Sequence, residues 1–209
     1  MIARLCLLTL IVAIAVTSAA AQETPAPGPL QPGAQAPDFT ATTLEGVPMR
    51  LDQWQGKVIV LNFFITWYRD AADHLQMMEV LQDGYEQAGM RLISVSLDEG
   101  ERGSEQVATL VREQQIAHPV VLDPELSVAQ LYGVRALPAI FIIGRDGKIA
   151  YYQEGFTEGD EQRLSSAIAM TLGVECLTPA ADETGDAAAT EAEQEAPEEP
   201  ICRCFRQKE

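Results

Sequence analysis

The stretch LNFFITWYRDAADHLQ, residues 61–76, decides which fold this chain can adopt. It continues the apolar run VIVLNFF (58–64), in which β-branched and aromatic side chains follow one another. Such a run is typical of a strand that is covered on both faces of a sheet. After a Thr-Trp pair, apolar residues recur at steps of three and four up to Gly89, namely Leu75, Met78, Leu81, Tyr85 and Ala88. This spacing predicts an amphipathic helix, so a buried strand leads into a helix through a short loop.

Strand and helix signals alternate on both sides of this stretch, over residues 37–173. Upstream, FTATT and VPMRL flank a Leu-Glu-Gly turn and predict a β-hairpin. Downstream, the strands RLISVSL and HPVVLD are each followed by a helix, and we expect the second helix to begin at Pro124 after an Asp123 cap. AIFII and IAYYQEG form an antiparallel pair, and a closing helix ends near Leu172. We therefore predict a three-layer α/β domain with a central sheet.

The first 21 residues have the pattern of a secretory signal peptide. Arg4 supplies a positive start, Leu5–Val16 is an apolar run, and Ala19-Ala20-Ala21 is a small-residue cleavage site. The apolar run is shorter than a membrane-spanning helix requires. We expect cleavage before Gln22, which removes Cys6, and a periplasmic or secreted protein that is not held in the membrane after cleavage.

Two segments outside the domain have biased compositions. Residues 22–36, QETPAPGPLQPGAQA, are rich in Pro and Gly and predict an extended linker. Residues 174–209 form a tail that is mostly Ala, Glu, Asp, Thr and Pro, a composition that buries too little apolar surface to fold, so we expect disorder. The tail closes on the apolar, cysteine-bearing and basic segment ICRCFRQKE.

The charge of the chain excludes one class of partner. It carries 31 acidic and 14 basic side chains, for a net charge of −17. Nucleic acids and anionic lipid surfaces require clustered Lys and Arg. We therefore expect neither as a partner.

The order of elements, together with two segments, resembles a known family. Residues 36–68 (APDFTATTLEGVPMRLDQWQGKVIVLNFFITWY) and 132–149 (YGVRALPAIFIIGRDGKI) are similar to the periplasmic thiol-disulfide oxidoreductases of the TlpA/ResA type, within the AhpC/TSA redoxin group. The resemblance implies a thioredoxin fold, with a central mixed β-sheet flanked by helices and an N-terminal β-hairpin. It covers residues 37–173.

The resemblance also implies where the active site of such a protein would lie. Trp67 matches the tryptophan before the first active cysteine, and Tyr68 and Ala71 stand where the family has its two cysteines. Pro138 matches the cis-proline that faces the dithiol. Trp67, Tyr68, Leu137 and Pro138 would then line the groove in which the family binds extended substrate.

The two replacements remove the chemistry of the family from the domain. Exchange needs a thiolate nucleophile with a lowered pKa and a second thiol that resolves the mixed disulfide. The phenol of Tyr68 is no substitute for a thiolate in attack on a disulfide, and the methyl group of Ala71 carries no nucleophile. No cysteine occurs between Met49 and Glu175 that could serve a peroxidase reaction.

Several polar and aromatic residues have a structural and a functional interpretation. Asp70 is expected to be the N-cap of the helix, and Asp73 suits its first turn. His74 and His118 are the only histidines, and we predict no metal site because no cysteine lies near them in sequence. Trp54, like Trp67, is expected to pack in the core or at its rim. We predict no cofactor.

The mature chain keeps Cys176, Cys202 and Cys204, for which three interpretations remain open. Cys176 pairs with Cys202 or Cys204 in a structural disulfide, or Cys202 and Cys204 form a redox-active pair whose pKa values Arg203 and Arg206 lower. The third interpretation is capture of a soft metal such as Cu(I) by the thiolates. An unpaired or partner-linked thiol is also compatible with the odd count.

Two function hypotheses follow from these observations. The first is a redox-inactive binding or scaffolding module that holds a periplasmic protein or peptide in the cis-proline groove. The alternative is a thiol-disulfide oxidoreductase that works through Cys202-Arg203-Cys204. In either case the tail itself is long enough to reach the groove, where Arg203 and Arg206 would meet Asp70 and Asp73.

Overall fold

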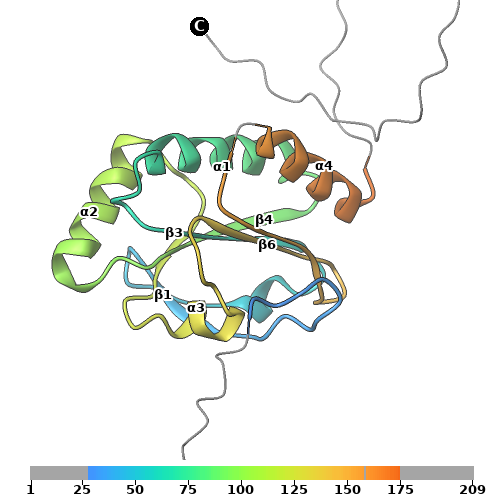
Figure 1. Cartoon of the computed structure of the whole chain (residues 1–209), viewed down its shortest axis with the longest axis horizontal. Coiled ribbons are helices and arrows are strands. Elements are labelled where there is room, and N and C mark those ends of the chain that lie inside the picture. Colours follow the sequence, from blue (N-terminus) through green and yellow to red (C-terminus); the bar gives the residue numbers. More distant parts are fainter. Residues whose placement is uncertain (1–27, 158, 175–209) are drawn as a thin grey trace, which may run out of the picture.

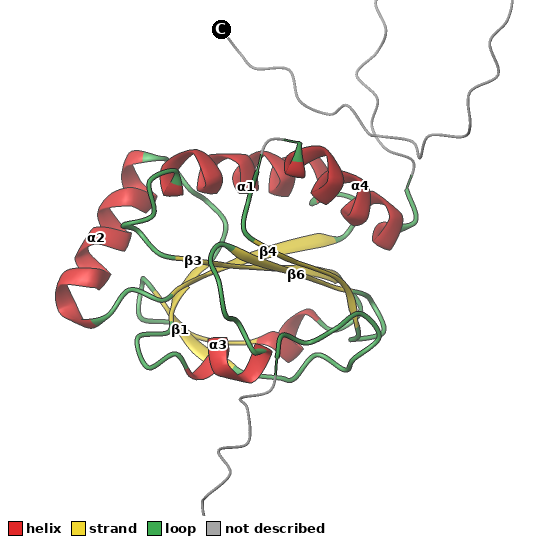
Figure 2. Ribbon diagram, in the orientation of Figure 1, coloured by secondary structure: helices red, strands yellow, loops and turns green. Residues whose placement is uncertain are grey.

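A twisted sheet of seven strands forms the centre of the molecule, and helices cover both of its faces (Figures 1 and 2). The computed structural model describes residues 28–157 and 159–174. In chain order the elements are β1 (Thr40–Thr43), β2 (Pro48–Arg50), the 3-10 turn η1 (Leu51–Trp54), β3 (Val58–Phe64), α1 (Ala71–Tyr85), β4 (Met90–Ser96), α2 (Gly100–Glu113), β5 (Val120–Leu122), α3 (Ser127–Tyr132), β6 (Ala139–Ile143), β7 (Ile149–Glu154) and α4 (Asp160–Leu172).

The sheet is mixed, with the strand order β2-β1-β5-β4-β3-β6-β7. Strands β3, β4 and β5 run parallel, while β1, β2, β6 and β7 pair antiparallel with their neighbours. The β1–β2 pair is the predicted N-terminal hairpin. In Figure 2, α1, α2 and α4 lie on one side of the sheet and α3 lies on the other. The predicted fold class, a mixed sheet between helices with an N-terminal hairpin, is confirmed.

Strand β3 is buried along its whole length, as the run VIVLNFF predicts. Its side chains alternate between two apolar clusters, because successive residues of a strand point to opposite faces. Leu61 and Phe63 pack with Tyr132 and other residues on the face covered by α3. Val58 and Val60 pack in the second cluster with side chains of α1 and α4.

Two helix starts differ from the sequence-based expectation. Helix α3 begins at Ser127 rather than at Pro124, because Leu126 adopts a left-handed conformation (φ 57°) that interrupts helical geometry. Asp123 still caps the helix, since its carboxylate accepts the Ser127 hydroxyl at 2.9 Å and the Ala129 amide at 2.9 Å. Asp70 stands at the N-cap position of α1, but its side chain makes no capping hydrogen bond.

The described part of the predicted linker packs against the domain. The Leu30 amide donates to the Tyr132 carbonyl at 3.1 Å and the Gly33 amide to the Ile149 carbonyl at 2.8 Å. Leu30, Ala34 and Ala36 contact the apolar cluster on the α3 side. Residues 28–36 therefore contribute to the folded core.

The predictions on the signal peptide and on Cys176, Cys202 and Cys204 fall on residues 1–27 and 175–209, which lie outside the described residues. Across the described residues no helix is long and apolar enough to cross a membrane.

Candidate functional site

The loop between β3 and α1, residues 65–70, carries Trp67 and Tyr68. Asp98, which is buried after β4, holds the start of this loop. Its two carboxylate oxygens accept the Thr66 amide at 3.2 and 3.0 Å, and one of them accepts the Thr66 hydroxyl at 2.6 Å. Asp98 is fixed in turn by the Ser96 hydroxyl at 2.8 Å. A buried carboxylate with these four hydrogen bonds positions the loop at the edge of the sheet.

The register of the sheet brings Pro138 to the same edge. Strands β3 and β6 are antiparallel, and Phe63 is paired with Ala139. Pro138 directly precedes β6 and the loop with Trp67 directly follows β3, so this pairing places both at the same end of the sheet. The Leu137–Pro138 peptide bond is cis, as the family resemblance implies. The Pro138 carbonyl accepts the Gly155 amide at 2.8 Å.

The predicted groove residues differ in exposure. The Trp67 side chain is 79% exposed, whereas Tyr68 and Leu137 are half-buried and Pro138 is buried. Ala71 is the first residue of α1 and only 3% exposed. Positions 68 and 71 are close, because the Ala71 amide donates to the Tyr68 carbonyl at 3.1 Å.

Two pockets flank this edge. The pocket beside Trp67, of about 420 Å³, lies against α2 and is lined by Thr66, Trp67, Arg102, Glu105, Gln106, Thr109, Leu110 and Glu113. The second, which we call the Tyr68 pocket, has about 160 Å³ and is lined by Tyr68, Asp70, Asp73, His74, Met77, Phe156 and Glu161. The loop thus separates a broad opening over α2 from a smaller acidic pocket over the first turns of α1.

A chain of buried polar side chains runs from the Tyr68 pocket across the face of the sheet that α1 covers. His74 Nε2 lies 2.7 Å from Asn62 Oδ1, and Asn62 Nδ2 donates to Ser94 Oγ at 3.1 Å. Ser94 Oγ lies 2.8 Å from His118 Nε2, and His118 Nδ1 contacts Glu79 Oε2. Asn62 and Ser94 are direct partners in the β3–β4 register. We call these five residues the polar chain.

The carboxylate at one end sets the direction of every hydrogen bond in the polar chain. Glu79 Oε2 also accepts the backbone amides of Ala117 and His118 at 3.1 and 3.3 Å, so it acts as an acceptor. His118 therefore carries its proton on Nδ1, and its Nε2 accepts the Ser94 hydroxyl. Ser94 then accepts from the Asn62 amide, and Asn62 Oδ1 accepts from His74 Nε2. This tautomer leaves His74 Nδ1 as a bare acceptor.

His74 Nδ1 is buried and has no hydrogen-bond partner. The side chain is 5% exposed and its ring meets the Phe156 ring edge-on, with centroids 5.1 Å apart. Burial lowers the pKa of His74 to about 4, because the charged imidazolium would lose its hydration. Burial also lowers the pKa of His118, against the opposing hydrogen bond and charge of Glu79. His74 is therefore neutral at pH 7.

The described residues contain no group of three or more His, Cys, Asp or Glu side chains that could hold a metal ion. His74 and Glu79 stand at the two ends of the polar chain, and Asn62, Ser94 and His118 lie between them. His118 uses both ring nitrogens in that chain, whereas His74 uses only Nε2. The arrangement is that of a structural hydrogen-bond network in which one ring nitrogen, His74 Nδ1, has no partner.

Sequence reasoning identified His74 and His118 but not the residues that connect them. One signal was available, since Asn62 is the only polar residue in the run VIVLNFF, and a buried amide needs polar partners. Ser94, Glu79 and Asp98 gave no comparable local signal. Trp54, expected in the core or at its rim, is partly buried against the apolar cluster on the α3 side.

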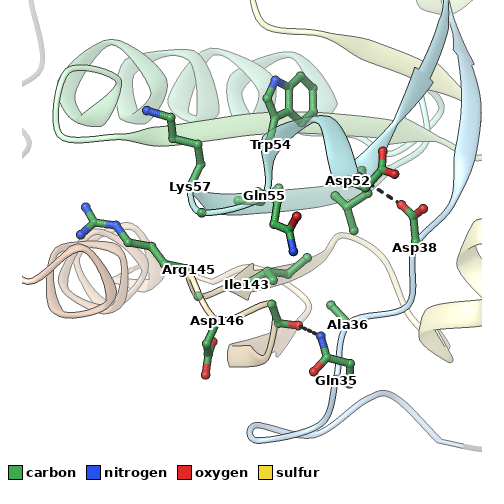
Figure 3. A pocket seen from close by; sticks show the side chains of 15 residues that line it. Gln35, Ala36, Asp38, Asp52, Trp54, Gln55, Lys57, Ile143, Arg145 and Asp146 are labelled. Carbon is green, nitrogen blue, oxygen red and sulfur yellow. Dashed lines mark hydrogen bonds between the residues drawn. The ribbon is translucent and has the colours of Figure 1, made fainter.

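Another pocket lies at the opposite edge of the sheet, where β3 begins and β6 ends (Figure 3). This opposite pocket has about 230 Å³. Its polar groups are largely engaged with one another: the Gln35 amide donates to the Gly147 carbonyl at 2.8 Å, and the Asp52 amide to Asp38 at 3.1 Å. Lys57 and Arg145 extend to one side of it (Figure 3). None of its buried polar side-chain atoms lacks a partner.

The strand order, the cis-proline and the loop at the start of α1 define a thioredoxin-like protein. The AhpC/TSA family matches residues 32–152, which is more than half of the chain. The chain belongs to this AhpC/TSA family.

Curated relatives are thiol-disulfide oxidoreductases. The chain is 32% identical to thiol-disulfide oxidoreductase ResA of Bacillus thuringiensis over 117 residues, which is 56% of this chain and 66% of that relative, just under two thirds of its length. It is 30% identical to ResA of Geobacillus kaustophilus over 137 residues, 65% of this chain and 77% of that relative.

Solved structures agree with this placement. The crystal structure of a candidate thiol:disulfide interchange protein DsbE from Chlorobium tepidum superimposes with a TM-score of 0.64 at 28% identity. The superposition covers 69% of this chain and 99% of that one. The comparisons therefore establish the fold. The chemistry possible at positions 68 and 71 depends on the side chains that this chain has there.

Proposed function

We propose that this is an exported AhpC/TSA-family protein whose domain binds a polypeptide partner beside the cis-proline and performs no thiol-disulfide exchange. Export is supported by the signal-peptide pattern of residues 1–21. A protein or peptide of the periplasm or extracellular space is then the partner.

The observation that carries this proposal is the identity of the side chains at the start of α1. The positions that match the family cysteines hold Tyr68, at the rim of a pocket, and Ala71, which is buried. The sequence has no cysteine between residues 28 and 174. Without a thiolate, neither attack on a disulfide nor resolution of a mixed disulfide takes place in the domain.

The features that support binding remain at the same edge. Trp67 exposes most of its ring, and tryptophan is among the residues that most often dominate the energy of an interface. Within the described residues, the backbone amide and carbonyl of Leu137 have no hydrogen-bond partner. An extended polypeptide can pair with these two groups as an added strand while its side chains contact Trp67.

Catalysis by the tail cysteines is the alternative, and an insulin-reduction assay separates the two functions. We expect the chain without its signal peptide to reduce insulin no faster than the buffer with dithiothreitol alone. The control is the same chain with Cys202→Ser and Cys204→Ser. Reduction by the first protein that is lost in the second would establish the oxidoreductase function and overturn the proposal.

Binding is tested with an unfolded polypeptide that cannot exchange disulfides. We expect insulin B chain with alkylated cysteines to bind the full mature chain and to shift the Leu137 amide resonance. Trp67→Ala should weaken this binding about tenfold, a typical effect of truncating an anchoring aromatic residue. Met170→Ala is the matched control, because Met170 is similarly exposed (80%) but lies on α4. Equal losses in both variants would contradict the groove.

A further inference from the structure

The pocket beside Trp67, which we call the Trp67 pocket, combines apolar and charged walls. Its volume is about 420 Å³, against about 160 Å³ for the Tyr68 pocket on the other side of the same loop. The Trp67 ring is mostly exposed, and Leu110 of α2 adds a second apolar side chain to the lining. Tryptophan is among the residues that most often anchor a bound polypeptide. The Trp67 pocket therefore offers an apolar contact that the domain itself leaves uncovered.

The charges of the Trp67 pocket favour a ligand that is mainly cationic. Glu105 and Glu113 of α2 contribute two carboxylates, and Arg102 contributes one guanidinium. None of the three forms a salt bridge with another residue that the structure describes. A polypeptide in which apolar side chains alternate with Arg or Lys would match this lining in both hydrophobicity and charge.

One segment of the chain itself has this chemistry. Residues 201–209, ICRCFRQKE, which we call the basic segment, combine Ile201 and Phe205 with three of the 14 basic side chains of the chain. The residues before it, 175–200, carry nine acidic side chains and no basic one. An acidic connection is repelled by the carboxylates of α2, whereas the basic segment is attracted to them.

The length of the connection fits the path from α4 to the Trp67 pocket. Helix α4 begins near the loop that carries Trp67, because Glu161 in its first turn lines the Tyr68 pocket. Its 13 residues carry the chain about 20 Å away from this loop. A flexible linker as long as residues 175–200 has a root-mean-square span of about 28 Å. A tethered ligand reaches its highest effective concentration when these two lengths are similar.

We propose that residues 201–209 dock in the Trp67 pocket of their own chain, with Phe205 packed on the Trp67 ring and the basic side chains beside the carboxylates of α2. A partner polypeptide must then displace the basic segment. An effective concentration near ~1 mM fills about 90% of a pocket whose intrinsic Kd is about 0.1 mM, and docking of this strength weakens a competing ligand about tenfold. The basic segment is thus an inhibitor that the chain carries.

This inference rests on the proposed function only where it names a competitor, since Trp67 then anchors both ligands. Docking itself is measured without a partner, so its failure and the failure of the proposed function are distinguishable. The effect of Trp67→Ala on insulin B chain is measured also in the variant Ile201→Ser with Phe205→Ser, where the basic segment no longer competes for the ring.

The first test asks whether the basic segment is able to reach the Trp67 pocket. Peptide mapping of the mature full chain without reduction should find Cys202 and Cys204 as thiols or linked to each other. Cys176 follows the end of α4 by four residues. A bridge from Cys176 to either tail cysteine in most molecules would hold the basic segment at that end of the helix and overturn the proposal.

The two tryptophans report on docking, because Trp67 lines the pocket in question and Trp54 lines the opposite pocket. In NMR spectra of the mature full chain, Ile201→Ser with Phe205→Ser should shift the indole Nε1–H resonance of Trp67 and leave that of Trp54 in place. Leu177→Ser is the control, because it removes an apolar side chain of the tail outside the basic segment. An unmoved Trp67 resonance, or an equal shift in the control, would overturn the proposal.

Charge variants test whether the basic segment docks on α2. Glu105→Gln with Glu113→Gln should move the Trp67 resonance toward its undocked position, as should high salt. The matched control is Asp83→Asn with Glu125→Gln, which makes the same change in net charge at exposed carboxylates outside the pocket. Equal movement in both pairs would mean that the overall charge of the domain attracts the segment, and would overturn the assigned site.

Competition with a partner is measured with alkylated insulin B chain. We expect Ile201→Ser with Phe205→Ser to raise its affinity for the mature full chain about tenfold. Unchanged affinity beside a shifted Trp67 resonance would show that the docked segment leaves the groove open and would overturn the inhibitory role. Absence of binding in both proteins would overturn the proposed function and the competition with it, while docking is decided by the Trp67 resonance.

Discussion

The Tyr68 pocket and the opposite pocket lie at the two edges of one sheet and differ in what they leave unpaired. The opposite pocket has the larger volume, about 230 against 160 Å³, and its exposed polar side chains Gln35 and Asp38 hydrogen-bond to the backbone of its own loops. The Tyr68 pocket is smaller, and one of the residues that line it, His74, has a buried ring nitrogen without a partner. The two pockets therefore differ in their polar partners as well as in volume.

The largest expected effect is the return of thiol chemistry at the edge with the Tyr68 pocket. In a chain whose native cysteines are replaced by Ser, Tyr68→Cys with Ala71→Cys should form an intramolecular disulfide in air. The reason is that both positions lie in one turn at the start of α1, where the helix dipole favours a thiolate. Alkylation followed by mass spectrometry measures it, with Tyr68→Cys alone as the control. If no disulfide forms, these positions do not match the family cysteines.

Breaking the polar chain should have the largest effect on stability. Asn62→Leu leaves the His74 Nε2–H and Ser94 without their buried partner, and we expect a loss of about 3 kcal/mol in the free energy of unfolding measured in urea. The matched control is Gln35→Leu, which removes an exposed amide at the opposite pocket and should change the free energy by less than about 0.5 kcal/mol.

A double variant then tests whether the lower free energy of unfolding of Asn62→Leu comes from buried polar atoms that lose their hydrogen-bond partner. His74→Leu added to Asn62→Leu removes both partners of one hydrogen bond, and replacing both partners with apolar groups is less costly than removing one. The two substitutions should therefore be non-additive, with a smaller loss than their sum. Strict additivity would mean that the hydrogen bond between them contributes nothing.

Stability should depend on pH through His74. The pKa of His74 is lowered from 6.5 to about 4 in the folded protein, so between these values the unfolded chain binds more protons. Stability from this group is fully present above pH 6.5 and falls as the pH decreases, by about 3 kcal/mol between pH 7 and pH 4. Urea unfolding across this range should show a flatter profile for His74→Gln. A parallel profile would mean that His74 titrates normally.

The smallest expected effect concerns the segment that borders the opposite pocket. A chain that begins at residue 37 loses the packing of Leu30, Ala34 and Ala36 on the core, which a chain beginning at residue 28 keeps. We expect the shorter chain to fold but to be less stable by about 2 kcal/mol, the order of one buried leucine side chain. Thermal melts of both chains measure the difference. Equal stability of the two chains would mean that residues 28–36 act only as a linker and do not stabilise the domain.

The fold could be predicted from local patterns to a large extent. The run VIVLNFF, the helical spacing up to Gly89 and the hairpin turns each report the burial of nearby residues, and the structure confirms the elements they predict. The start of α3 was misjudged, because the left-handed Leu126 satisfies no local propensity rule and is held by the turn that Asp123 organises.

The candidate site was only half predictable. Trp67, Tyr68, Leu137 and Pro138 are predicted to line a groove only through the family resemblance, and the register of β3 with β6 places them at one end of the sheet. The polar chain was missed because its hydrogen bonds join residues 12, 32, 24 and 39 positions apart, a spacing that belongs to no helix or strand period.

The sequence by itself determined the order of strands and helices and the absence of a thiol at positions 68 and 71. Both are local properties, one of periodicity and one of side-chain identity. Only the tertiary structure decided that Asn62 stands opposite Ser94, that Glu79 orients the protons as far as His74, and that His74 Nδ1 is buried without a partner. The physical reason is that hydrogen bonding in a buried site depends on strand register and helix docking, which bring together residues that are distant in the chain.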